Sequence, residues 1–250
     1  MQLTILGSGT NVHPSRAASG YLIQTDQPFL LDFGPRTLMN LARTGTSRHE
    51  VRTVLFSHYH ADHFSDFITF FFDAVYYSRH VGKRPDLTII GPPGTKKLFG
   101  LILKAFPGFD AAAFRVNLRE VANDEIRIGL TTIVARTVVH SPRLHCLGYR
   151  IEHDDRVLAY SGDAKYCSSV VDLCSHADIA VLDCSFPSTK PGQGHMHAGQ
   201  CGQVAHEAGA RRLILSHFYP IAERYDVKKQ AGRRFGGRIT KARDRMRIKI

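Results

Sequence analysis

The sequence predicts a mixed α/β fold in which two strand-rich halves, roughly residues 1–130 and 131–250, pack face to face with helices on the outside. Short apolar runs, which are typical of buried strands, alternate with stretches of helical periodicity along the chain. The strands are too numerous and too short for a simple series of β-α-β units, and no linker rich in Ser, Gly or Pro interrupts them. We therefore expect one domain that spans residues 1–250.

Up to residue 139, short runs of Val, Ile, Leu and Phe bounded by Gly and Pro indicate strands at 3–6, 21–25, 29–33, 51–57, 87–91, 114–120, 125–128 and 131–139. The stretch 36–44 has apolar residues at helical spacing and stops at Gly45, which is typical of a helix C-terminus. The same kind of spacing predicts helices over 66–77, which is rich in aromatic residues, and over 95–106.

The rest of the chain repeats this alternation. Apolar runs rich in branched side chains predict strands at 147–152, 157–162, 179–184 and 212–217. Helical spacing between these runs predicts helices at 168–177 and 198–209. A basic helix near 224–234 and a terminal strand near 241–249 complete the expected order.

The chain is basic, with 33 Lys and Arg against 22 Asp and Glu and a net charge of +11. Residues 201–250 hold 13 of the basic residues and 4 of the acidic ones, so most of the excess lies there. Such a balance is compatible with an anionic partner such as nucleic acid, an anionic substrate or an acidic membrane surface, but from charge alone a solvated surface helix and edge strand is the slightly better explanation. The proportions of 43% hydrophobic and 22% charged residues exclude a disordered chain or a coiled coil as the main class.

Several features predict a cytoplasmic protein with no membrane partner. The five cysteines form no Cys-x-x-Cys pair, which argues against a disulfide framework or a thiolate zinc cluster. The segment MQLTILGSGT lacks the basic start and apolar core of a signal peptide. The most apolar stretch, 64–77, is too short to span a bilayer and contains Asp66 and Asp73.

The densest chemical signal is the segment HYHADH, which directly follows the expected strand 51–57. It places three histidines and an aspartate within six residues, and imidazole and carboxylate are ligands that zinc accepts. His58 and His60 share one side of an extended segment, whereas Asp62 and His63 lie on the following turn and can face a second metal ion. The position between a buried strand and a helix favours a metal site over a surface loop that is merely rich in histidine.

Further ligands are expected downstream, because one cluster cannot complete two coordination spheres. Three candidates stand just past the carboxyl end of an apolar strand: His140 after TTIVARTVV, Asp163 after VLAYSG, and His217 after RRLILS. A single such residue is best explained as a capping or hydrogen-bonding group. Three of them together with HYHADH point to a binuclear metal site.

These motifs resemble the metallo-β-lactamase superfamily, whose signature is HxHxDH. The resemblance extends along the whole chain and is strongest to the ribonuclease Z-like branch, through LGSGT, LLDFGPRT, IIGPPG, YSGDAKYC, GHMHA and LILSHFYP. It implies a metallo-β-lactamase αβ/βα four-layer sandwich with two Zn²⁺ ions, although Mn²⁺ or Fe can occupy the same ligand types. By this resemblance one ion is held by His58, His60 and His140, the other by Asp62, His63 and His217, with Asp163 bridging them.

The chemistry that the resemblance implies is hydrolysis by a metal-bridging hydroxide, since paired zinc ions lower the pKa of a shared water. Asp62 can orient this hydroxide. His195 is the candidate that contacts the scissile phosphate or protonates the leaving group. The branch has threonine two residues after that histidine, where this chain has His197. Possible substrate contacts are Arg16, Lys165, Tyr166 and His197. A surface role explains Arg16 equally well, and His197 is better explained as an N-terminal surface residue of the following helix.

Two departures from ribonuclease Z limit the assignment. Its His-Glu-Ala-Thr motif is replaced here by Leu182-Asp183-Cys184-Ser185, and the stretch from Gly94 to His140 is too short and too regular for an inserted tRNA-binding arm. We therefore expect a metal-dependent di-zinc hydrolase of phosphodiester or related phosphate-ester bonds, with an anionic substrate that can be RNA. The alternatives are a tRNA 3′-processing endonuclease, a lactone, thioester or β-lactam hydrolase, and a non-catalytic nucleic-acid-binding protein. Relatives in this branch are often dimers, so a homodimer is a further expectation.

Overall fold

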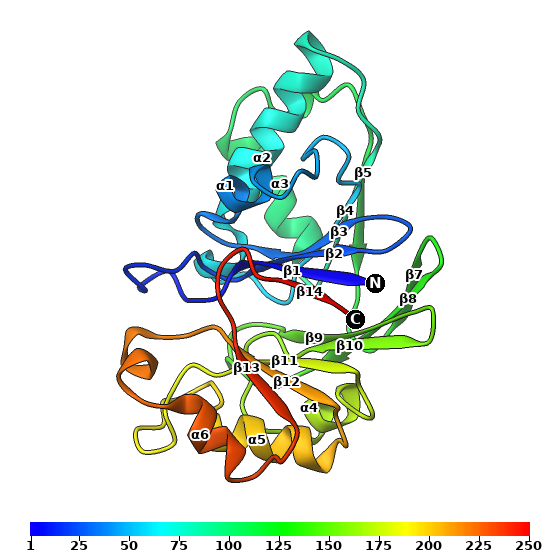
Figure 1. Cartoon of the computed structure of the whole chain (residues 1–250). Coiled ribbons are helices and arrows are strands. Elements are labelled where there is room, and N and C mark those ends of the chain that lie inside the picture. The colour runs from blue at the N-terminus through cyan, green and yellow to red at the C-terminus, as the bar shows by residue number, and fades with distance from the viewer.

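The computed structural model describes residues 1–250 and consists of two seven-stranded sheets with helices on their outer faces (Figure 1). The layers run helices, sheet, sheet, helices, which confirms the expected αβ/βα four-layer sandwich. None of the helices combines the length and the apolar character needed to cross a membrane.

The first sheet contains β1 (Gln2–Gly7), β2 (Gly20–Gln24), β3 (Phe29–Phe33), β4 (Thr53–Leu55), β5 (Leu87–Gly91), β6 (Val116–Glu120) and β14 (Arg247–Lys249). Their order is β14-β1-β2-β3-β4-β5-β6. Neighbours from β14 to β3 are antiparallel, and those from β3 to β6 are parallel. On the outer side lie α1 (Thr37–Ala42), α2 (Ala61–His80), α3 (Thr95–Ala105) and the short η1 (Phe109–Ala111) (Figure 1).

The second sheet contains β7 (Glu125–Ile128), β8 (Thr131–Thr137), β9 (Leu147–His153), β10 (Arg156–Tyr160), β11 (Ile179–Asp183), β12 (Arg212–Ser216) and β13 (Arg238–Lys241). Their order is β13-β12-β11-β10-β9-β8-β7, antiparallel from β7 to β10 and parallel from β10 to β13. The helical elements of this half are α4 (Ser168–Leu173), α5 (Ala198–Glu207), η2 (Pro220–Arg224) and α6 (Val227–Gly232).

One large apolar core joins the facing sides of the two sheets. Leu3 and Leu31 of the first sheet belong to the same buried cluster as Ile133 and Leu158 of the second. A separate cluster lies between the first sheet and its helices, where Phe67, Phe70 and Phe71 pack at the three- and four-residue spacing of one helix face. Complete burial of a phenylalanine side chain contributes about 1.5–3 kcal/mol, so this aromatic face fixes α2 on the sheet.

The order of strands and helices follows the sequence prediction, with three local corrections. The helix expected over 66–77 begins at Ala61, because the last residues of HYHADH form its first turn and the apolar spacing starts only afterwards. The strand expected near 241–249 is two strands, of which β13 pairs in the second sheet and β14 returns to β1. Since β7 also pairs in the second sheet, the boundary between the halves falls before residue 125 rather than at 130.

Candidate metal centre

The predicted ligands meet where strands of both sheets end. His58 and His60 follow β4, and His140 follows β8. Asp163 follows β10 and His217 follows β12. Because β4 belongs to the first sheet and the other three strands to the second, the site forms only when the two sheets are packed together.

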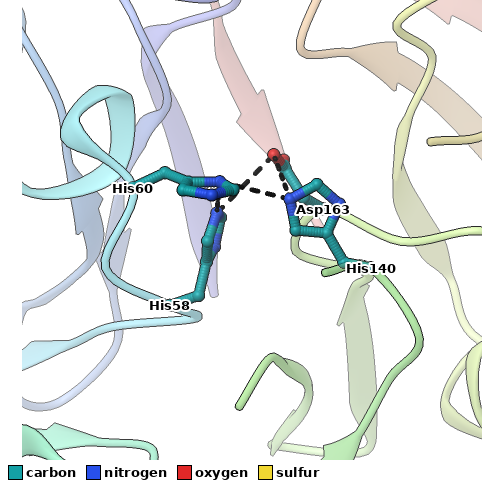
Figure 2. Close-up of side chains that lie close together, drawn as sticks. All are labelled: His58, His60, His140 and Asp163. Carbon is teal, nitrogen blue, oxygen red and sulfur yellow. Dashed lines mark hydrogen bonds and ion pairs between the residues drawn. The ribbon is translucent and has the colours of Figure 1, made fainter. Parts of the chain in front are cut away.

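The first group consists of His58, His60, His140 and Asp163, whose side chains point toward one another (Figure 2). His60 Nδ1 lies 2.9 Å from His58 Nε2 and 3.2 Å from His140 Nε2. Asp163 Oδ2 lies 3.7 Å from His58 Nε2 and 3.8 Å from His140 Nε2. Three imidazole nitrogens and one carboxylate oxygen thus face a common point.

The second group consists of Asp62, His63 and His217. His63 Nε2 and His217 Nε2 are 3.2 Å apart, and Asp62 Oδ2 lies 3.5 Å from His217 Nε2. The other oxygen of Asp163, Oδ1, lies 3.2 Å from His63 Nε2 and 3.3 Å from His217 Nε2. Asp163 therefore faces both groups, one with each carboxylate oxygen.

Neighbouring groups fix the orientation of four of these rings. Each of these groups forms a hydrogen bond with Nδ1 of its ring, so that Nε2 points into the cluster. The four pairs are the Ser57 hydroxyl with His58 (3.0 Å), Asp32 with His63 (2.7 Å), the Gly194 carbonyl with His140 (2.7 Å) and the Ser185 hydroxyl with His217 (3.1 Å). Partners of this kind set the tautomer and orientation of metal-binding histidines. These contacts orient the four rings in the way that a metal site requires, so the two groups could each hold a metal ion.

Asp32 is the central residue among these partners, and the sequence analysis did not single it out. It is fully buried and accepts hydrogen bonds from the Ser57 backbone (2.7 Å), the Ser57 hydroxyl (2.7 Å) and the Tyr160 hydroxyl (2.6 Å). The available signal was a carboxylate within the apolar strand FLLDF, since a buried carboxylate needs charged or hydrogen-bonding partners. Its partner, His63, could not be read from that strand.

The electrostatics of the cluster favour cations. Burial opposes the protonation of His63, but attraction to Asp163 and Asp32 outweighs burial and raises the pKa of His63 to about 10. Burial likewise opposes the ionisation of Asp163, yet attraction to His217 and His63 holds its pKa well below its usual value. Asp163 Oδ1 is buried and accepts no hydrogen bond. A buried carboxylate oxygen without a hydrogen bond needs another partner. A metal ion such as Zn²⁺, which accepts carboxylate and imidazole ligands, would be that partner.

His195 lies at the edge of this cluster and is held by Asp183, which the sequence analysis did not assign a role. His195 Nδ1 is 2.8 Å from Asp183 Oδ2 and 3.8 Å from Asp163 Oδ2. Asp183 is buried, and its Oδ1 accepts hydrogen bonds from the Ser185 backbone (3.1 Å) and hydroxyl (2.6 Å). Burial lowers the pKa of His195, but the charge of Asp183, its hydrogen bond and the charge of Asp163 together outweigh burial, so the pKa lies above its usual value. The signal available was a carboxylate at the end of another apolar strand, IAVLDC.

The possible substrate contacts lie outside the two groups. The Arg16 side chain forms an ion pair with Glu223 (2.6 Å) and lies over the Phe218 ring. Lys165 is exposed, and the Tyr166 hydroxyl donates a hydrogen bond to Glu207 (2.6 Å).

His197 also lies outside the two groups and has a structural role. It is the N-cap of α5, where its Nδ1 accepts a hydrogen bond from the Gln200 backbone (3.3 Å). The structure thus gives Arg16, Tyr166 and His197 partners within the chain, and no protein acceptor contacts the Lys165 ammonium.

Comparisons with known proteins agree with this geometry. Residues 28–218 match the family described as the beta-lactamase superfamily domain. The uncharacterized protein Rv1339 of Mycobacterium tuberculosis is 33% identical over 96% of this chain and 88% of the relative. Ribonuclease Z of Mycobacterium bovis is 27% identical over 100% of this chain and 98% of the relative. The metallo-beta-lactamase fold protein YhfI of Bacillus subtilis superposes with a TM-score of 0.86 at 25% identity, over 99% of this chain and 98% of that one. The chain therefore belongs to the metallo-β-lactamase superfamily of hydrolases, with ribonuclease Z among its relatives.

Proposed function

We propose that the protein is a metal-dependent phosphodiesterase whose site holds two metal ions, with zinc the ion that best suits the ligands. His58, His60 and His140 would hold one ion, and Asp62, His63 and His217 the other, with Asp163 facing both. The donor set of imidazole and carboxylate is typical of Zn²⁺, and the same set accepts Mn²⁺ or Fe. Two divalent ions bound there would activate water and neutralise charge on the phosphoryl oxygens.

The observation that carries the phosphodiester assignment is the pair of His195 and Asp183. Asp183 accepts a hydrogen bond from His195 Nδ1, and Nε2 has no protein partner, so the protonated ring can donate its Nε2 proton to a substrate. Attraction to Asp183 and Asp163 holds the pKa of His195 above its usual value, which favours the protonated ring. An alkoxide leaving group needs such a proton, and a pentacoordinate phosphorus needs positive charge near its oxygens. His195 is placed to supply either one beside the metal ligands.

Asp62 and Asp163 have separate tasks in this proposal. Asp163 is buried between the two groups and sets their spacing through its two oxygens. Asp62 is partly exposed, with a side-chain exposure of 12%, so one of its oxygens can orient an attacking water as well as bind metal. Their different exposure supports a structural role for Asp163 and a position next to substrate for Asp62.

A panel of substrates tests the proposal. The metal-loaded protein and its His195→Ala variant are assayed with bis(p-nitrophenyl) phosphate, an alkyl phosphodiester, a precursor tRNA, a lactone and a cephalosporin. We expect turnover of bis(p-nitrophenyl) phosphate. With an alkyl phosphodiester, whose alkoxide leaving group needs a proton, we expect His195→Ala to lower turnover about 10²-fold or more while the metal content is unchanged. Turnover of the lactone or cephalosporin alone would replace the proposal by a carbonyl-attacking hydrolase.

Ribonuclease activity is a second candidate function, favoured by the full-length match to ribonuclease Z. It predicts cleavage of the precursor tRNA with an affinity that falls steeply as salt is added, because RNA binding releases counterions. Salt-independent turnover of the small phosphodiester, without cleavage of the tRNA, would leave the small-substrate phosphodiesterase as the function.

A further inference from the structure

An open polar pocket lies between α5 and α6, outside the metal ligands. Its volume is about 430 Å³, and none of the residues that line it is hydrophobic or acidic. The two helices are in direct contact, since a Cβ added at Gly202 of α5 would lie 2.2 Å from the Ala231 carbonyl of α6 (Figure 1). The helices therefore form a close-packed base for the pocket.

The polar groups around the pocket are oriented as hydrogen-bond donors. The carbonyl oxygen of the Gln200 side chain accepts the His197 backbone N–H (3.2 Å), and that of Gln230 accepts the Ser188 backbone N–H (2.7 Å). Each amide is thereby fixed with its NH₂ group free of a protein acceptor. The Ser188 hydroxyl accepts the Gly199 backbone N–H (2.8 Å), which leaves its own proton to donate.

His197 adds one more donor. Its Nδ1 accepts a hydrogen bond from the Gln200 backbone N–H and therefore carries no proton. The proton of the imidazole is then on Nε2, which can donate into the pocket. The first backbone N–H groups of α5 are taken up by protein acceptors, so the donors of this pocket are side chains.

Two arginines supply the charge. Arg233 and Arg234 line the pocket, are exposed, and form no ion pair with any acidic residue of the chain. Gln203, which also lines the pocket, donates its amide to Glu207, an acid that is itself outside the lining. Two uncompensated guanidinium groups among oriented donors form a site for an anion with several acceptor oxygens.

We propose that this pocket is a binding site for a phosphate group, separate from the metal centre. Its six donor residues are Ser188, His197, Gln200, Gln230, Arg233 and Arg234. His195 of the metal site is only two residues from His197, so their Cα atoms lie within about 7 Å. The phosphate is either a free ion or one that belongs to a nucleic-acid strand running past the metal centre.

The test is an equilibrium binding measurement on the full-length protein as purified. Inorganic phosphate is titrated by calorimetry, and a fluorescein-labelled RNA pentamer with phosphorothioate linkages is titrated by anisotropy. The pocket variant is Arg233→Gln with Arg234→Gln, and the control is Lys228→Gln with Lys229→Gln. The control removes the same charge from exposed residues of α6 that do not line the pocket. Binding at the metal centre is common to both variants, so the difference between them reports the pocket.

We expect the pocket variant to raise the Kd about tenfold or more, the scale of a lost charge-assisted contact, and the control less than about twofold. If the pocket variant raises the Kd of both probes, the ligand is a free phosphate. If it raises the Kd of the pentamer alone, the ligand is a phosphate of a nucleic-acid strand. An equal change in Kd in the pocket variant and the control, or an unchanged Kd in both, would refute the proposed site.

Gln230→Glu provides an independent check that keeps the acceptor for the Ser188 backbone. It adds a negative charge to the pocket and should weaken binding of whichever probe depends on the arginines, whereas unchanged affinity would contradict the proposal. Because no turnover is needed, the result stands whether or not phosphodiester hydrolysis is observed.

Discussion

Replacement of Asp183 by asparagine tests the proposed role of His195 most directly. The carboxylate accepts His195 Nδ1 (2.8 Å) and the Ala164 backbone N–H (3.1 Å) with Oδ2, and the backbone and hydroxyl of Ser185 with Oδ1. Asparagine keeps the volume but has only one oxygen. If that oxygen stays on His195, the amide nitrogen faces Ser185, whose hydroxyl can turn to accept while its backbone N–H loses its acceptor. One unsatisfied buried N–H costs about 1–3 kcal/mol of stability.

The catalytic effect comes from the lost charge. Without the carboxylate, only Asp163 still opposes the effects of burial and of His217, so the pKa of the His195 ring falls. A weaker acid affects only reactions whose leaving group needs a proton. We therefore expect kcat to fall about 10²-fold or more with an alkyl phosphodiester, equivalent to about 2.7 kcal/mol, and much less with bis(p-nitrophenyl) phosphate.

The assay measures kcat for both substrates, the metal content, and the free energy of unfolding in urea. Asp178→Asn is the matched control: Asp178 also accepts a backbone N–H, from Val157 (2.9 Å), but lies outside the metal-binding groups. An equal decrease with both leaving groups, or loss of metal in Asp183→Asn, would show that Asp183 maintains the cluster rather than the acidity of His195.

Three further predictions concern the metal centre itself. Asp163→Ala should abolish turnover and lower the metal content, since this residue faces both groups, and a metal-loaded active variant would refute the bridging position. Metal binding at pH 8 should release at least one proton, because attraction to Asp163 and Asp32 raises the pKa of His63 to about 10 and the ring must lose its Nε2 proton to bind; calorimetry in buffers of different ionisation enthalpy measures the number, and no release contradicts it. Gly34→Ala should lower stability by about 1–3 kcal/mol and reduce metal affinity, because the new Cβ would lie 1.9 Å from the Asp62 carbonyl; an unchanged urea midpoint and metal Kd would show that the first turn of α2 can shift.

The order of the elements along the chain and the positions of the candidate ligands can be predicted from the sequence because both follow from apolar runs. Each predicted ligand outside HYHADH directly follows such a run, and the carboxyl ends of parallel strands meet at one edge of a sheet. The roles of Asp32 and Asp183 could not be predicted, because each contacts a histidine that is far away in the sequence. Asp32 contacts a histidine 31 residues away and Asp183 one that is 12 residues away, so neither partner is visible in the local pattern.

The role of His197 illustrates a different limit. The usual capping signature has Ser or Thr at the N-cap and Glu or Gln three residues later, and here histidine occupies the first position with Gln200 at the second. The prediction that His197 contacts substrate therefore competes with a position at the N-terminus of the helix, and the structure places the residue at that N-terminus. The capping geometry fixes the ring in one tautomer, and this fixed donor is the feature that the proposed phosphate pocket uses.

The metal centre and the packing of the two sheets depend on each other. His58 and His63 come from the first half of the chain, whereas Asp163 and His217 come from the second, so neither half contains a complete ligand group. Cross-sheet hydrogen bonds join the same two layers, including that from the Tyr160 hydroxyl to Asp32 (2.6 Å), which in turn orients His63. Ions that bind only the packed state stabilise it by mass action. Metal affinity should therefore report the docking of the sheets, and a core substitution far from any ligand can weaken metal binding by loosening that interface.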